Sequence, residues 1–157
     1  MDYEIALLID RPGAMPRLSE LFIDEWTPWY GPDGKGNALT DLVDCMNRDR
    51  LPIAVVAESK NGLVLGSAAL KRESLGSEFG FGPWLAAVVV DPDFRNHGVG
   101  SSLIRAVEKQ AKKLAFTEIF TSTDTANSIV ERRGWECLDQ AVQSLRGPVS
   151  IYKKVFS

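Results

Sequence analysis

A strongly apolar segment, WLAAVVV at residues 84–90, leads through a short loop into two glycines spaced one residue apart, Gly98 and Gly100. An unbroken apolar run of this length is typical of a strand that is covered on both faces. From Val99 to Leu114 apolar residues recur at three- and four-residue intervals, which predicts a helix. The chain must therefore build a layered fold in which a buried strand passes almost directly into a helix.

Around this unit the remaining patterns predict a mixed α/β domain. Lys60-Asn61-Gly62 separates two apolar segments, and Asn-Gly at such a position is a strong hairpin signal. Between the first two predicted helices, the prolines and glycines of residues 26–32 are expected to exclude regular structure. Glu108 and Lys112 predict an i,i+4 ion pair on the outer face of the long helix. The expected order is β-α-α-β-β-β-α-β-α-β-β, with strands at 3–9, 53–57, 63–70, 84–90, 117–122, 135–138 and 149–156 and helices at 16–26, 39–47, 99–114 and 125–133.

Length, charge and residue types limit the function classes. The 157 residues contain no internal repeat, low-complexity tract or linker, which predicts a single domain over residues 1–157. Lys+Arg 18 against Asp+Glu 21 gives a net charge of −3, which argues against a nucleic-acid partner. No apolar run approaches the roughly 18–20 residues of a membrane span, and the acidic start is unlike a signal peptide, so we expect a cytoplasmic protein with no membrane partner. The single histidine and the two separated cysteines predict neither a metal site nor a disulfide framework.

The loop after residue 90 has the properties of an anion site. Glycines at a helix start let the backbone turn tightly and approach a ligand. The first amides of a helix lack internal partners and the helix dipole is positive there, which suits a phosphate group. Arg95 would add charge-assisted hydrogen bonds to the same anion. Two common phosphate motifs do not fit: no lysine follows either glycine as in a P-loop, and Leu103 stands where a dinucleotide fingerprint needs its third glycine.

A third phosphate-binding pattern fits the segment completely, because R-x-x-G-x-G, formed by Arg95, Gly98 and Gly100, follows a strand that ends in V-x-V-D-P. In this respect the sequence resembles the GNAT superfamily of N-acetyltransferases. The order of elements is similar to that family along nearly the whole chain. Ala126, followed by ERRGW at residues 131–135, resembles the family's A-x-x-x-[Y]-E-K-L-G-F segment. The resemblance is greatest to small bacterial members of unassigned substrate.

The resemblance implies a GNAT-like α/β (α+β) fold, with a mixed, mostly antiparallel central sheet flanked by helices. It implies that acetyl-CoA is the co-substrate, with its pyrophosphate on the loop and its pantetheine arm paired to the main chain of residues 88–90. In that family the strand at 84–90 splays from the strand at 117–122, and the thioester lies in the gap. The cofactor-binding residues implied are Val88, Val89, Val90, Arg95, Asn96, His97, Gly98, Val99, Gly100 and Ser101.

The family's catalytic pattern is incomplete in this chain. N-acetyl transfer needs a neutral amine, and in many members a tyrosine just before E-K-L-G-F protonates the departing thiolate; Val130 stands at that position. Thr123 replaces the asparagine that the family pattern has seven residues earlier. Because a thiol with a pKa of about 8.5 is already a fair leaving group, positioning can dominate the rate. Glu73 and Glu78 are the candidate catalytic bases, acting through water, although ordinary solvated loop charges would look the same.

Aromatic residues mark the expected acceptor side. Trp26, Trp29 and Tyr30 cluster between the first two predicted helices, where the family's substrate pocket is often walled, and an ordinary hydrophobic cluster explains them equally well. Asp24 and Glu25 add acidic charge that suits either a cationic acceptor or a solvated helix face.

Three functions remain open. The leading hypothesis is an acetyl-CoA-dependent N-acetyltransferase, in which a primary amine of a small molecule attacks the thioester directly in a ternary complex. No cysteine or serine constellation predicts a covalent enzyme intermediate. Val130 favours instead a non-catalytic acetyl-CoA-binding sensor or interaction module, and a protein N-acetyltransferase is the third alternative. The resemblance also allows a homodimer, with the terminal strand around Ile151-Tyr152 as the segment that would pair or exchange.

Overall fold

The computed structural model describes residues 2–156. Its strands are β1 (Tyr3–Leu7), β2 (Ile53–Ser59), β3 (Val64–Lys71), β4 (Trp84–Val90), β5 (Glu118–Thr123), β6 (Glu136–Ser144) and β7 (Gly147–Val155). Its α-helices are α1 (Met15–Glu25), α2 (Thr27–Tyr30), α3 (Ala38–Asp44), α4 (Val99–Lys113) and α5 (Asn127–Arg132).

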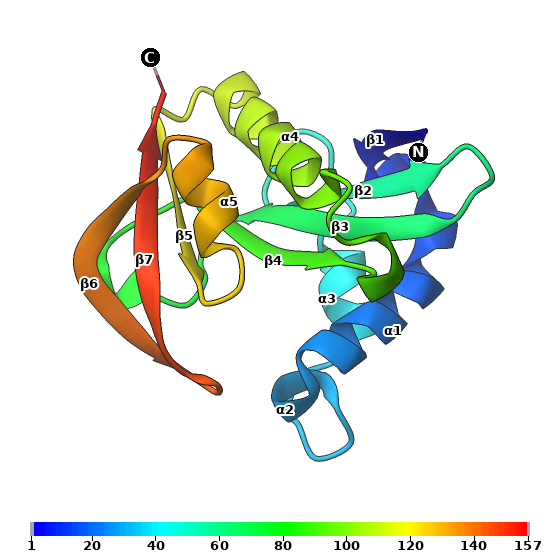
Figure 1. Ribbon diagram of the computed structural model, residues 1–157, viewed down its shortest axis with the longest axis horizontal. Helices are drawn as coiled ribbons and strands as arrows, with labels where there is room; N and C mark the ends of the chain where they lie inside the picture. Colours follow the sequence, from blue (N-terminus) through cyan, green and yellow to red (C-terminus); the bar gives the residue numbers. More distant parts are fainter. Residues whose placement is uncertain (1, 157) are drawn as a thin grey trace.

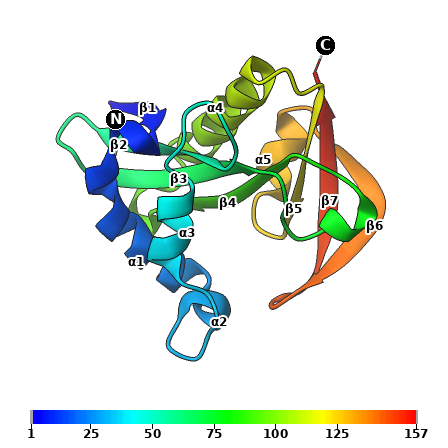
Figure 2. The same cartoon turned by 180° about the vertical axis from the view of Figure 1, so that it is seen from behind.

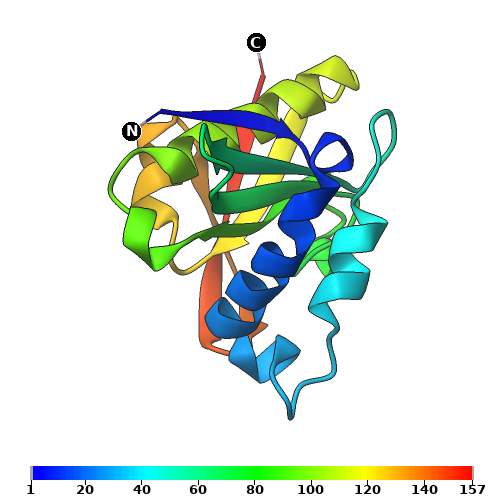
Figure 3. The same cartoon turned by 90° about the vertical axis from the view of Figure 1, so that its right-hand side faces the viewer.

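The strands form one seven-stranded sheet in the order β1-β2-β3-β4-β5-β7-β6. Neighbouring strands are antiparallel except β4 and β5, which run parallel. Helices cover both faces of the sheet: α4 and α5 lie in front of it in Figure 1, and α1 and α3 lie in front of it in Figure 2. Figure 3 shows the layers from the side of β1, with the strands between α4 and the pair α1 and α3. The predicted mixed, mostly antiparallel sheet flanked by helices is confirmed.

The order of elements follows the expected one, with one additional short helix. The prediction that residues 26–32 exclude regular structure was wrong, because α2 occupies Thr27–Tyr30 within this stretch. Pro28 is tolerated there, since it stands in the first helical turn, where no amide donor is needed. The amide of Tyr30 donates to the carbonyl oxygen of Trp26 at 2.8 Å and closes the turn.

The strand expected at 135–138 is longer than its pattern indicated, since β6 continues to Ser144 along the edge of the sheet. Most of its side chains are exposed, so the segment carries no apolar alternation from which its length could be inferred. β7 is hydrogen-bonded to β5 on one side and to β6 on the other, which places Ile151 and Tyr152 inside the sheet. β7 therefore offers no open edge to a second chain, and a homodimer stays a prediction.

The prediction of an ion pair between Glu108 and Lys112 on the outer face of α4 was also wrong. Glu108 is 6% exposed and lies in the buried stripe of the helix, away from solvent. Its carboxylate accepts hydrogen bonds from Arg133 at 2.6 and 3.2 Å and from the indole of Trp135 at 2.9 Å, and the Lys154 ammonium lies at 3.5 Å. These four residues, the Glu108 cluster, tie α4 to the end of α5 and to β7.

The two parts of the sheet join at one end and separate at the other. β4 and β5 share a single register pair, Trp84 with Phe120, and the amide of Phe120 donates to the carbonyl oxygen of Pro83 at 2.9 Å. Thr121 adds a side-chain hydrogen bond to the carbonyl oxygen of Leu85 at 2.8 Å. Beyond this point the strands diverge toward their carboxyl ends, as Figure 1 shows. The splay that the family resemblance implies is thus present.

Candidate active site

Strand β4 contains a bulge where it leaves β5. Ser67 of β3 is in register with Val89, but Ala69 is in register with Ala86, so β4 has one residue more than β3 over this stretch. Ala87 takes up the extra length at φ +54°, a conformation that residues other than glycine rarely adopt. Because β4 and β5 share only the register pair Trp84 with Phe120 among the described residues, the edge of β4 that faces the splay has no strand neighbour beyond that pair. Apart from the two small alanines before the three valines, nothing in the local sequence indicates this bulge.

The chain beyond β4 is fixed by a buried carboxylate. Asp91 accepts hydrogen bonds from the amide of Asp93 and from the guanidinium of Arg17, both at 2.9 Å. Burial alone would raise the pKa of Asp91, but the hydrogen bonds from Arg17 and from Asp93 outweigh it and hold that pKa below its ordinary value. The amide of Asp91 donates to the carbonyl oxygen of Leu65 at 2.8 Å. The start of the loop is therefore attached to both α1 and β3.

The loop enters α4 through two residues in left-handed conformations, Asn96 at φ +67° and Gly98 at φ +80°. Gly98 is the N-terminal cap, and the first internal bond of α4 runs from the amide of Ser102 to the carbonyl oxygen of Gly98 at 3.0 Å. The amides of residues 99–101 precede that bond, so they project from the helix N-terminus without a helical partner. His97 is exposed beside them. These amides and the positive end of the helix dipole form a preorganised site for an anion.

The predicted cofactor-binding residues meet at the carboxyl end of β4. Val88 and Val90 pack toward the core beneath α4, whereas Val89 is buried against the core beneath α1. The side chain of Arg95 is directed toward α1: its Nε donates to the carbonyl oxygen of Val90 at 3.3 Å, and a terminal nitrogen donates to Glu25 at 3.4 Å. Ligand binding by these residues stays a prediction.

The position of the family's tyrosine carries no acid. Val130 is fully buried in the core beneath α4. At the end of β5, the hydroxyl oxygen of Thr123 accepts hydrogen bonds from the amides of Ala126 at 2.9 Å and Thr125 at 3.2 Å. Thr123 therefore organises the chain that leads into α5.

Glu73 and Glu78 lie in the connection between β3 and β4, and both are exposed. This connection enters β4 at Trp84, at the end of the strand opposite to the loop of residues 91–98. The strand has seven residues, which corresponds to about 20 Å at roughly 3.3 Å per residue. A role for either glutamate as catalytic base stays a prediction.

An aromatic cluster forms where α1 meets α2. The ring of Phe22 lies 5.2 Å from that of Trp26 and 5.6 Å from that of Tyr30, measured between centroids. Tyr30 donates a hydrogen bond to the carboxylate of Asp41 at 2.5 Å. Burial, and after it the hydrogen bond to Asp41, raises the pKa of Tyr30 far above its ordinary value, so its hydroxyl keeps the proton. Trp29, by contrast, is 43% exposed. A role of these aromatic residues in acceptor binding stays a prediction.

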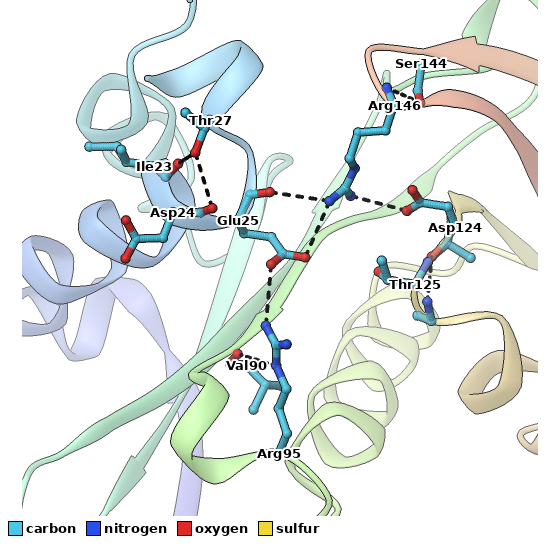
Figure 4. A network of polar contacts seen from close by, with 12 residues as sticks. Ile23, Asp24, Glu25, Thr27, Val90, Arg95, Asp124, Thr125, Ser144 and Arg146 are labelled. Carbon is cyan, nitrogen blue, oxygen red and sulfur yellow. Dashed lines mark hydrogen bonds and ion pairs between the residues drawn. The ribbon is translucent and has the colours of Figure 1, made fainter. Parts of the chain in front are cut away.

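A chain of ion pairs crosses the open end of the splay (Figure 4). Glu25, the last residue of α1, lies 3.4 Å from Arg95 and 3.7 Å from Arg146. Arg146, in the turn between β6 and β7, also lies 3.2 Å from the carboxylate of Asp124 after β5. We call these four residues the Glu25 network. Sequence reasoning missed Arg146, because no local pattern in a hairpin turn shows which distant helix it will meet.

A pocket of about 390 Å³ opens beside the Glu25 network, between one face of α1 and the end of β4. Both acidic residues that the sequence singled out on α1, Asp24 and Glu25, line it. Arg17 and Arg95 line it as well, so the pocket wall carries both signs of charge.

In the comparison with protein families, the model of the acetyltransferase (GNAT) family matches residues 15–132, well over half of the chain. The chain belongs to the GNAT acetyltransferase family. The family prediction is confirmed, and with it the prediction that this chain is an acetyltransferase enzyme. Among curated proteins no sequence matches the chain.

Solved structures of this GNAT fold resemble the chain over nearly its whole length. An aminoglycoside 6'-N-acetyltransferase complexed with coenzyme A has a TM-score of 0.75 at 17% identity, with 97% of this chain and 96% of that chain covered. The aminoglycoside 6'-N-acetyltransferase from Enterococcus faecium has a TM-score of 0.73 at 18% identity, with the same coverage of 97% and 96%. The yncA protein of Salmonella typhimurium, solved with its cofactor acetyl-CoA, has a TM-score of 0.74 at 15% identity and covers 100% of this chain and 95% of its own.

Within residues 2–156 no helix is long and apolar enough to cross a membrane. The same residues contain no group of three or more His, Cys, Asp or Glu side chains arranged to hold a metal ion.

Proposed function

We propose that this GNAT acetyltransferase moves the acetyl group of acetyl-CoA to the primary amine of a small molecule. The observation that carries the proposal is the set of helix-start amides at residues 99–101, held at the end of β4 beside the splay from β5. The neighbours solved with coenzyme A and acetyl-CoA support the choice of co-substrate. The two aminoglycoside acetyltransferases among them support a small amine as acceptor.

The residues of the loop fit a diphosphate. The amides of residues 99–101 would donate to its oxygens, and the helix dipole would stabilise its charge. A side chain at Gly100 would crowd the start of α4, because its Cβ would lie 3.3 Å from Ile129 of α5 and 3.7 Å from Val90. Along residues 88–90 the main chain would pair with the pantetheine arm, and the bulge at Ala87 would offer a peptide donor to the thioester carbonyl.

The proposed reaction is a direct transfer in a ternary complex. An ammonium group first loses a proton through water, and Glu73 and Glu78 are the bases we propose for that step. The neutral nitrogen attacks the acetyl carbon, a carbon–nitrogen bond forms, the carbon–sulfur bond breaks, and coenzyme A leaves as its thiolate. The nitrogen gives up its remaining extra proton, through water, to the departing thiolate, so the products are the N-acetylated amine and coenzyme A thiol. Because the pKa of such a thiol is about 8.5, the departing sulfur needs little help from an acid, which is consistent with Val130 at the family's tyrosine position. Orientation by the loop and the bulge then supplies most of the acceleration.

Thiol release from acetyl-CoA tests this function. The purified protein is given acetyl-CoA and a panel of amines that includes an aminoglycoside, a diamine and a neutral primary amine, and acetylated products are identified by mass spectrometry. We expect release above the enzyme-free rate with at least one amine, together with its N-acetylated product. A protein that binds acetyl-CoA but releases no thiol with any amine would contradict the proposal.

One observation favours a second function. Val130, which is fully buried, leaves the usual acid position without a hydroxyl, as in a domain that binds acetyl-CoA without using it. Such a sensor would bind acetyl-CoA and coenzyme A with clearly different affinities, because it has to distinguish the two. Calorimetric titration with each compound separates this function from the enzyme, which must also release coenzyme A.

A further inference from the structure

One carboxylate at the site is shared by two arginines that come from different parts of the fold. Arg95 belongs to the phosphate loop after β4, and Arg146 to the turn between β6 and β7. Glu25 lies 3.4 Å from the first and 3.7 Å from the second, and its main-chain oxygen also accepts a hydrogen bond from Arg146 at 3.4 Å. Figure 4 shows Glu25 between the two guanidinium groups. Because one carboxylate pairs with both guanidinium groups, the ion pair of either arginine with Glu25 weakens the ion pair of the other.

The neighbouring carboxylates have partners of their own. Asp91 is bonded to Arg17 at 2.9 Å, and Asp124 lies 3.2 Å from Arg146. Within residues 2–156 Glu25 is therefore the carboxylate that pairs with Arg95 by direct contact. The hydrogen bond from Arg95 Nε to the carbonyl oxygen of Val90 keeps this side chain folded back toward α1.

We propose that Glu25 competes with the diphosphate of acetyl-CoA for Arg95, and that Arg146 weakens this competition by drawing on the same carboxylate. The inference rests on the proposed function, because it assumes that coenzyme A binds at the amides of residues 99–101. Glu25 thereby links the phosphate loop to the β6–β7 turn across the open end of the splay. Affinity for the cofactor becomes dependent on a residue, Arg146, that lies far from the phosphate motif in the sequence.

The competition predicts opposite effects for two substitutions. Glu25→Gln removes the competitor, so Arg95 is free for the diphosphate and coenzyme A binds more tightly. In Arg146→Ala, Arg95 is the one arginine still paired with Glu25 and their ion pair becomes stronger. Arg95 is then less available to the diphosphate, so coenzyme A binds more weakly. The ion pairs are solvent-exposed to a considerable degree, with Arg95 at 50% and Arg146 at 36%, so each effect should be about two- to fivefold. Both effects should shrink at high salt, because exposed charges are screened.

Calorimetric titration with coenzyme A tests the inference without any knowledge of the acceptor. Wild type, Glu25→Gln and Arg146→Ala are compared at low and at high NaCl concentration. Glu4→Gln removes an equally charged residue from an exposed ion pair with Arg11, and Arg50→Ala removes an exposed arginine from the loop before β2; these two variants are the matched controls.

The expected result is tighter binding by Glu25→Gln, weaker binding by Arg146→Ala, and wild-type affinity in both controls. Because the two effects have opposite signs, a general loss of folding cannot produce the pattern. In the double variant Arg95→Ala/Glu25→Gln, the change at Glu25 should have no further effect. If wild type binds coenzyme A and Glu25→Gln binds it equally or more weakly, this inference is overturned while the proposed function stands. If wild type binds no coenzyme A, the proposed function fails and the inference falls with it.

Discussion

Replacing Glu108 by glutamine would remove one negative charge from the Glu108 cluster with almost no change in side-chain volume. The side chain of Glu108 is buried, and its carboxylate accepts hydrogen bonds from Arg133 and Trp135. Glutamine keeps one acceptor oxygen but turns a donating amide toward these donor groups. Removing one partner of a buried ion pair costs about 3–5 kcal/mol. Because Arg133 and Lys154 are 22% and 23% exposed and regain some hydration, we expect the lower end, about 3 kcal/mol.

Urea unfolding measures this loss. In thermal unfolding of a domain of this length, a loss of about 3 kcal/mol of unfolding free energy corresponds to a fall in Tm of roughly 6–12 °C. The matched control is Glu118→Gln, which makes the same chemical change in an exposed ion pair with Lys153 and should alter the free energy of unfolding by less than about 1 kcal/mol. Equal stabilities of the Glu108→Gln and Glu118→Gln variants would refute the reasoning.

The pH dependence provides a second check on Glu108. Burial alone would raise the pKa of Glu108, but the hydrogen bonds from Arg133 and Trp135 and the charge of Lys154 outweigh it and lower that pKa. A carboxyl group whose pKa is lower in the folded state contributes its stability above the unfolded pKa of about 4.3, and loses it as the pH falls through the folded value. The stability difference between wild type and Glu108→Gln should therefore be constant near neutral pH and shrink below about pH 4. A difference that grows on acidification would contradict this assignment.

Three further predictions concern the site. Gly98→Ala and Gly62→Ala introduce the same backbone strain, at φ +80° and φ +82°, and neither new Cβ has an atom within 4 Å. Both variants should therefore lose about 1 kcal/mol of unfolding free energy in a urea titration. Calorimetry should show weakened coenzyme A binding for Gly98→Ala alone. If Glu73 or Glu78 is the base, its replacement by glutamine should lower kcat by about 10²-fold with unchanged affinity for coenzyme A; wild-type kinetics in both variants would exclude the pair. Tyr30→Phe should lose the hydrogen bond to Asp41 and about 1–2 kcal/mol of unfolding free energy in a urea titration, and unchanged stability would show that this bond contributes nothing.

The long-range part of the Glu108 cluster could not be predicted from sequence, although a local clue was present. Glu108 stands at helical spacing with Ile104, Val107 and Ala111, which places it in the buried stripe of α4. The incorrect prediction of an ion pair between Glu108 and Lys112 rested on their local spacing alone. The actual partner, Arg133, is 25 residues away and reaches Glu108 only once α5 packs on α4.

The loop from Asp91 to Gly98 was accessible to sequence reasoning because its backbone geometry is local. A strand end, two glycines and a helix start suffice to place main-chain amides side by side, whatever the rest of the fold does. The bulge at Ala87 and the contact between Glu25 and Arg146 depend instead on strand register and on the docking of distant elements. Most of the fold and the helix-start geometry after β4 were therefore predictable, whereas the β4 bulge and the Glu25 network were not.

Thermal unfolding in the presence of acetyl-CoA, coenzyme A and NAD tests most directly whether the amides at the start of α4 bind the coenzyme. At 100 times Kd, a ligand specific for the folded state stabilises it by about 2.7 kcal/mol. For a domain of this size we therefore expect Tm to rise by about 5–10 °C with acetyl-CoA and with coenzyme A, and to stay unchanged with NAD. An unchanged Tm with both coenzyme A compounds at high concentration would contradict the assignment of the phosphate loop and of the function built on it.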